Sequence, residues 1–103
     1  MKILVSPGFG AGWSTWVYDA EASRLALTWA PLIEFIEAGG DKNELTWDHP
    51  ALAGLQDVYP DLYVSTNVLD LYVVDIPAGT SFRINEYDGS ESIDYGQGFI
   101  TAD

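Results

Sequence analysis

The hydrophobic pattern begins with "KILV", in which Lys2 is followed by three aliphatic residues. A continuous apolar run of this length, ended by Pro7-Gly8, predicts a buried first strand over residues 2–6. Residues 6–16, "SPGFGAGWSTW", contain too many glycines and prolines for a regular element. They are therefore expected to form a loop that turns the chain sharply after this strand.

Two segments have the apolar spacing of amphipathic helices. The first is expected from Pro31 to Ala38, because proline suits a first helical position and Gly39-Gly40 is a good stop signal. The second is expected over residues 48–60, with Asp48 or His49 as its cap and Leu52 and Leu55 in its buried stripe.

The remaining apolar segments alternate with polar residues and predict strands. Residues 23–29 alternate Leu25, Leu27 and Trp29 with small or polar residues, which favours a strand. Residues 68–76 and 81–87 are expected to be strands, and 91–95 to return as a partner after a tight turn at Asp88-Gly89. Consecutive strands pair antiparallel.

The elements together predict an α+β fold, a small antiparallel β-sheet with two short helices packed on one face. A length of 103 residues fits a single domain over residues 1–103. The chain has no cysteine, which excludes disulfides and thiolate metal sites and fits a reducing compartment. No signal peptide or membrane span is recognisable, so a cytoplasmic protein is expected.

Charge is the strongest property of the whole sequence. The formal net charge is −12, and residues 48–103 carry ten acids against one base, Arg83. Such a chain repels nucleic acid and anionic membranes and attracts a basic protein surface. The alternative is that the acids only keep the protein soluble.

The glycine loop does not match the standard phosphate or nucleophile motifs. Gly8 and Gly10 fit the dinucleotide pattern, but Trp13 replaces its third glycine, and no Lys-Ser/Thr pair follows for a P-loop. Trp16 stands where a nucleophile elbow needs glycine. The sequence leaves open a pairing of Ser14 with His49, the single histidine.

The acidic residues offer weak candidates for acid–base or metal chemistry. Glu34 and Glu37 share a helix face, but a solvated surface explains them equally well. The segment "DGSESID", with Asp88, Glu91 and Asp94, lacks the spacing of a calcium-binding hand. No cofactor or metal is expected, and no catalytic residue is assigned.

The aromatic and acidic residues are better candidates for contacts with a partner. Trp13 and Trp16 lie three apart, so both indoles are expected to point the same way, either into the core or toward a partner. Same-face residues of a strand repeat about every 6.6–6.8 Å, close to the phosphate spacing of one nucleic-acid strand. The acids expected to imitate such a phosphate track are Asp70, Asp75, Glu86, Asp88, Glu91 and Asp94.

The runs "MKILVSPGFGAGWSTW" and "INEYDGSESI" resemble short, mostly uncharacterised proteins of tailed phages and prophages. This resemblance, with the small size and acidic charge, implies a host-directed inhibitor of the anti-CRISPR or anti-restriction type. Proteins of that class often block a nucleic-acid-binding surface. The resemblance implies no individual catalytic or binding residue.

Three functional hypotheses follow. The first is a non-enzymatic protein that binds and inhibits a basic, nucleic-acid-binding host protein, without binding nucleic acid or membrane itself. The second is a small-ligand or signalling-nucleotide binding protein that uses the glycine and tryptophan loop, with Arg83 as the anion contact. A surface ion pair with Glu91 or Asp94 is the simpler role for Arg83. The third is a housekeeping structural subunit, for which an obligate homo-oligomer such as a homodimer would be the first sign.

Overall fold

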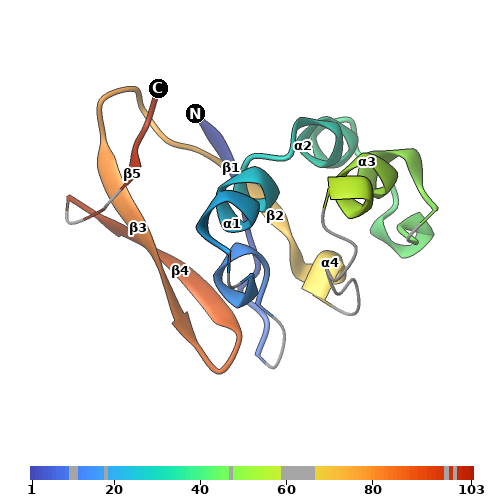
Figure 1. Cartoon of the computed structure of the whole chain (residues 1–103), viewed down its shortest axis with the longest axis horizontal. Helices are drawn as coiled ribbons and strands as arrows, with labels where there is room; N and C mark the ends of the chain where they lie inside the picture. The colour runs from blue at the N-terminus through green and yellow to red at the C-terminus, as the bar shows by residue number, and fades with distance from the viewer. Residues whose placement is uncertain (10–11, 18, 47, 59–66, 97, 99) are drawn as a thin grey trace.

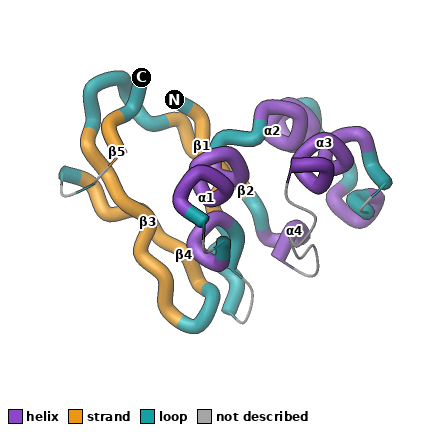
Figure 2. The backbone as a smooth tube through the Cα atoms, in the orientation of Figure 1, coloured by secondary structure: helices purple, strands orange, loops and turns teal. Residues whose placement is uncertain are grey.

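The structure, a computed structural model, describes residues 1–9, 12–17, 19–46, 48–58, 67–96, 98 and 100–103. It confirms the α+β class. Two small antiparallel sheets combine with several short helices (Figures 1 and 2). Strand β1 (Lys2–Val5) pairs with β2 (Tyr72–Asp75), and β3 (Ser81–Tyr87) lies between β4 (Ser90–Tyr95) and β5 (Ile100–Thr101).

The helices lie mainly on one side of β1 and β2, and the three-stranded sheet lies on the other (Figure 1). The helical segments are η1 (Ser14–Trp16), α1 (Ala20–Leu27), α2 (Ala30–Glu37), η2 (Lys42–Glu44), α3 (Pro50–Val58) and α4 (Asn67–Asp70). The two predicted helices are confirmed as α2 and α3, and α1 and α4 add to them.

Strand β1 is buried on both faces, which explains its continuous apolar sequence. Alternation directs Leu4 into a core formed with the helices, where it meets Trp13, Leu52 and Leu55. The same alternation directs Ile3 and Val5 into a second core beneath the three-stranded sheet, with Phe82 and Ile76. The two cores thus share one strand.

Two strand predictions are wrong. Residues 23–29 are not a strand, because α1 covers Ala20–Leu27 and begins at Asp19, whose carboxylate accepts the Glu21 N–H at 3.0 Å. The strand expected over residues 68–76 is also too long. Its first part forms α4, and only β2 is extended.

The predicted hairpin is confirmed. Strand β3 pairs with β4 from Phe82↔Tyr95 to Tyr87↔Ser90. The turn between them is made by Asp88 and Gly89, with φ of 50° and 86°. Two successive positive φ angles are what a tight hairpin turn of right-handed twist requires, and Asp-Gly meets that need.

Candidate functional site

A buried carboxylate, that of Glu91 on β4, fixes the glycine-rich loop. Only 2% of Glu91 is exposed. Its Oε1 accepts the Ser6 N–H at 3.0 Å, and its Oε2 accepts the N–H groups of Trp13 at 2.9 Å and Thr15 at 3.1 Å, as well as the Thr15 hydroxyl. The Glu91 N–H in turn donates to the Ser6 carbonyl at 2.8 Å. The loop is thereby held at both of its ends against β4.

These hydrogen bonds correct the expectation that Glu91 lies on an exposed acidic surface. A side chain this buried cannot contact a partner, and its role is to hold the loop in place. The converging N–H groups resemble the donors with which loops cradle phosphate. Here the chain's own carboxylate occupies them, so the N–H groups of Ser6, Trp13 and Thr15 are not available to a bound nucleotide.

The two loop tryptophans point in opposite directions. Trp13 is 1% exposed, lies in the helical core and donates its Nε1–H to the Ala26 carbonyl at 2.9 Å. Trp16 is 43% exposed and donates its Nε1–H to Glu86 Oε1 at 3.1 Å. The expectation that both indoles share one direction is wrong, and Trp13 is part of the core.

The turn of the β3–β4 hairpin lies beside the loop, at the lower edge of the molecule in Figure 1. The Ser90 hydroxyl donates to the Pro7 carbonyl at 2.7 Å, and the Gly89 N–H donates to Glu86 Oε1 at 3.3 Å. Exposed aromatic and acidic side chains therefore lie on neighbouring segments around the hairpin turn, with Glu86 and Tyr87 on opposite faces of β3. We call them the tip surface, and they are Phe9, Trp16, Glu86, Tyr87 and Asp88.

Phe9 and Tyr87 belong to the tip surface but were not predicted as contact residues. They are 72% and 79% exposed, the highest values among the large hydrophobic side chains of the described residues. Alternation along β3 places Tyr87 on the face opposite buried Phe82, so its exposure follows from the strand pattern. Phe9 stands between two glycines, which gives no signal of its direction, so its exposure could not be predicted.

Asp70 lies next to this same end of the molecule. A Cβ at Gly8 would collide with the Asp70 carboxylate, so the end of α4 and the loop are in contact. Exposed Leu69 and Tyr72 flank Asp70 in sequence, and Tyr72 pairs with Val5 where β1 enters the loop. Among the described residues, the exposed large hydrophobic side chains thus lie toward one end, and Tyr95 is the exception on the opposite part of the hairpin.

The other predicted acids do not join the tip surface. Asp75 lies at the far end of β1 and β2, 3.5 Å from the amino-terminal nitrogen. Asp94 forms an ion pair with Arg83 at 2.9 Å, as the simpler role for Arg83 predicted. Glu86 and Glu91 share one face of the hairpin and Asp94 lies on the other, because cross-strand pairs alternate between faces. The six acids therefore do not form one continuous track.

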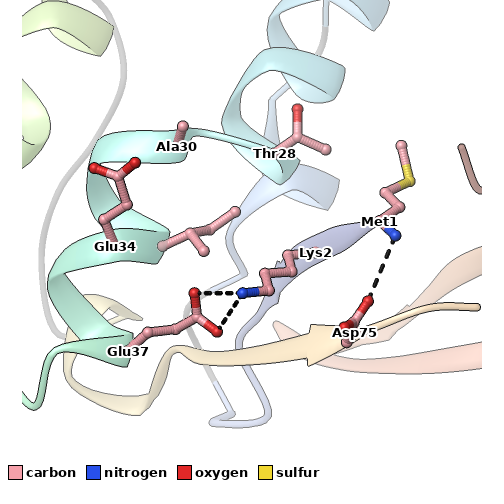
Figure 3. A pocket seen from close by; sticks show the side chains of 8 residues that line it. Met1, Lys2, Thr28, Ala30, Glu34, Glu37 and Asp75 are labelled. Carbon is pink, nitrogen blue, oxygen red and sulfur yellow. Dashed lines mark hydrogen bonds and ion pairs between the residues drawn. The ribbon is translucent and has the colours of Figure 1, made fainter.

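An open depression of ≈560 Å³ lies near the amino terminus, away from the tip surface (Figure 3). Its charged side chains are largely paired with one another. Lys2 Nζ lies 2.9 Å from the Glu37 carboxylate, and the hydrogen bond to Glu37 raises the pKa of Lys2. Glu34 and Glu37 line this depression, and Glu37 is neutralised by Lys2 rather than paired with Glu34 for acid–base work.

The catalytic pairing left open by the sequence finds no support. His49 Nδ1 accepts the Ala51 N–H at 3.0 Å, so His49 caps α3 as one of the two expected cap residues. Its ring packs edge-on against Phe35, with 4.8 Å between centroids. Ser14 is buried in η1, where its carbonyl accepts the Ser23 hydroxyl at 2.7 Å.

Among the described residues, no group of three or more His, Cys, Asp or Glu side chains could hold a metal ion. In the same part of the chain, no helix has the length and apolar character needed to cross a bilayer.

Comparison with known proteins finds no matching family model, no similar curated protein and no similar solved structure. The resemblance to phage proteins therefore stays a prediction.

Proposed function

We propose that the protein is a non-enzymatic binding module whose tip surface docks onto a basic surface of a partner protein. The supporting observation is a cluster of exposed aromatic side chains on a loop that buried Glu91 holds in place. Aromatic residues dominate the binding energy of protein interfaces. Loop residues that hydrogen bonds already hold in the free protein lose less conformational entropy on binding.

The charge of the chain sets the chemistry of the partner. Glu86 and Asp88 lie within the tip surface, Asp70 lies nearby, and the whole chain carries a net charge of −12. Complementary charge steers a basic partner toward this end and disfavours acidic ones. We propose a host nucleic-acid-binding protein as the partner, in the host cytoplasm, with inhibition arising because the bound module covers its basic surface.

We propose contact through a single end of the molecule instead of imitation of a phosphate track. The acids predicted for such a track lie on different faces of the hairpin. Binding of a small ligand in the loop is less favoured, because Glu91 already engages the loop N–H groups. Arg83, the anion contact of that hypothesis, is paired with Asp94.

Affinity capture with matched variants tests the proposal. The double variant Trp16→Ala/Tyr87→Ala removes two exposed aromatic groups, and Tyr95→Ala removes one from the opposite part of the hairpin. Captured host proteins are identified by mass spectrometry. We expect basic proteins that bind to the wild type and to Tyr95→Ala but not to the double variant. Identical captured sets for all three proteins would contradict docking through the tip surface.

A further inference from the structure

Within the tip surface, Trp16 and Glu86 form a pair in which an aromatic ring lies beside a carboxylate. We propose that this pair is a receptor for the guanidinium group of an arginine on the partner protein. The inference rests on the proposed function and specifies the chemical group that the partner presents.

The Glu86 carboxylate is held in place by one oxygen and open at the other. Its Oε1 accepts both the Trp16 indole N–H at 3.1 Å and the Gly89 N–H at 3.3 Å. Among the described residues, no hydrogen bond to Oε2 and no ion pair with Glu86 is formed. Glu86 is exposed, so Oε2 can accept a hydrogen bond from a molecule that approaches from solvent.

The indole of Trp16 is supported on one side and accessible elsewhere. A Cβ at Gly12 would lie 2.6 Å from Trp16 Cδ1, so the glycine backbone packs closely on the five-membered ring. The residue nevertheless remains 43% exposed. A cation over an exposed tryptophan ring is attracted by the electron-rich face. Asp88, in the adjacent turn, strengthens the negative potential around this position.

The chain's own cations are largely engaged away from this pair. Lys2 binds Glu37, Lys42 donates to the Leu71 carbonyl at 2.6 Å, and Arg83 binds Asp94. Arg24, the fourth basic side chain, forms no ion pair with Glu86 among the described residues, so the pair is left for a cation from outside.

Arginine fits the pair better than lysine does. A guanidinium group is planar, so it can stack on the face of an indole while its N–H groups point outward, parallel to the ring, toward a neighbouring carboxylate oxygen. A lysine ammonium is a compact, strongly hydrated charge and does not stack. The combination of a supported ring and one open carboxylate oxygen thus favours a guanidinium.

Nuclear magnetic resonance of the intact protein tests this assignment through the tryptophan indole N–H signals. The Trp13 and Trp29 indoles donate to the buried carbonyls of Ala26 and Ala51 and serve as internal references. The probe is the tripeptide acetyl-Gly-Arg-Gly-amide, compared with its lysine and citrulline analogues at constant ionic strength. The variant Trp16→Phe identifies the Trp16 signal by removing it.

We expect the arginine peptide to shift the Trp16 signal with a dissociation constant on the order of 1–10 mM, as suits one exposed cation–π contact and one exposed ion pair. The Trp13 and Trp29 signals should not move, and Glu86→Gln should weaken binding about threefold or more. An unmoved Trp16 signal, or equal shifts with the lysine or citrulline peptide, overturns the assignment. If capture still depends on Trp16 and Tyr87, that outcome refutes only the arginine receptor, since docking is tested separately.

Discussion

Glu91 is the residue on which the arrangement of the loop depends most. A buried carboxylate is tolerated only when hydrogen bonds replace the water it has lost. Glu91 gains three N–H donors and one hydroxyl from residues that lie 76–85 positions earlier in the chain. A single side chain therefore links the amino-terminal loop to the carboxy-terminal hairpin.

Replacing this carboxylate by an amide should destabilise the fold. In Glu91→Gln one acceptor oxygen becomes an NH₂ group, which faces donors that it cannot satisfy. We expect the free energy of unfolding to fall by about 2–4 kcal/mol, the usual cost of disrupting a buried, charge-assisted network. Urea denaturation measures the change.

Asp88→Asn is the matched control for this substitution. It makes the same carboxylate-to-amide change at an exposed turn position, and asparagine tolerates the positive φ of 50°. Its effect should stay within about 0.5 kcal/mol. Equal stabilities of the Glu91 and Asp88 variants would show that the buried network contributes nothing measurable.

Gly12 should control the position of the Trp16 indole. In Gly12→Ala the new methyl group would lie 2.6 Å from Trp16 Cδ1, so the indole must move. Because Trp16 is partly exposed, it can move at little cost in stability, but its hydrogen bond to Glu86 should break. We expect the Trp16 indole N–H to exchange with solvent faster in this variant. Unchanged exchange would mean that the ring adapts without leaving Glu86.

The directions of the two tryptophans show where reasoning from residue spacing fails. Residues three apart share a side only within a helix. Trp13 precedes η1 and has a non-helical backbone, with φ −107° and ψ −100°, so the spacing rule does not apply to it. Alternation along β4, in contrast, places Glu91 on the same face as Ile93. That alternation is a signal for an inward-facing Glu91, although the charge of the side chain argues for the surface.

At the scale of elements, short-range signals predict those elements that have clear ends. Strand β3 and the hairpin turn follow from alternation and Asp-Gly, and α2 from proline and the two glycines. Helix α1 was missed because Leu25 and Leu27 mimic strand alternation. Ala22 and Ala26, four apart and both buried, carry the helical period instead.

The cap of η2 gives a pH-dependent prediction. Asp41 accepts hydrogen bonds from Asn43 N–H and Nδ2, each at 3.0 Å, and these bonds lower the pKa of Asp41 below its usual 3.8. A lowered folded-state pKa stabilises the fold above the unfolded-state value. That contribution is lost as the pH falls through the folded-state pKa.

We therefore expect wild type to melt at a higher temperature than Asp41→Ala at pH 7, and the difference to narrow as the pH falls below 3.8. Asp41→Asn keeps a capping oxygen but does not titrate, so its advantage over Asp41→Ala should persist in acid. Thermal unfolding followed by circular dichroism from pH 2.5 to pH 7 measures both differences. If the melting temperature of wild type exceeded that of Asp41→Ala by the same amount in acid as at pH 7, the ionised Asp41 carboxylate would not be what stabilises η2.

At the scale of the whole molecule, the sequence predicts the sign of the charge but not its distribution. Net charge adds up along the chain, whereas the position of each acid depends on contacts between distant residues. Glu91 accepts hydrogen bonds from the loop, whereas Asp94 forms an ion pair with Arg83 and Asp75 forms one with the amino terminus. These three contacts separate acids that the strand sequences alone would place in one row.

This distribution predicts that charge and aromatic contacts will affect different rate constants for binding a captured basic partner. The acids create a long-range field, so the association rate constant should fall about tenfold or more as salt is raised from 50 to 500 mM. Trp16 acts only at contact, so Trp16→Ala should raise the dissociation rate constant and leave association nearly unchanged. Surface plasmon resonance separates the two rate constants, with Tyr95→Ala as the control. If Trp16→Ala slowed association and left dissociation unaltered, Trp16 would not lie in the interface, because a neutral side chain contributes nothing to steering.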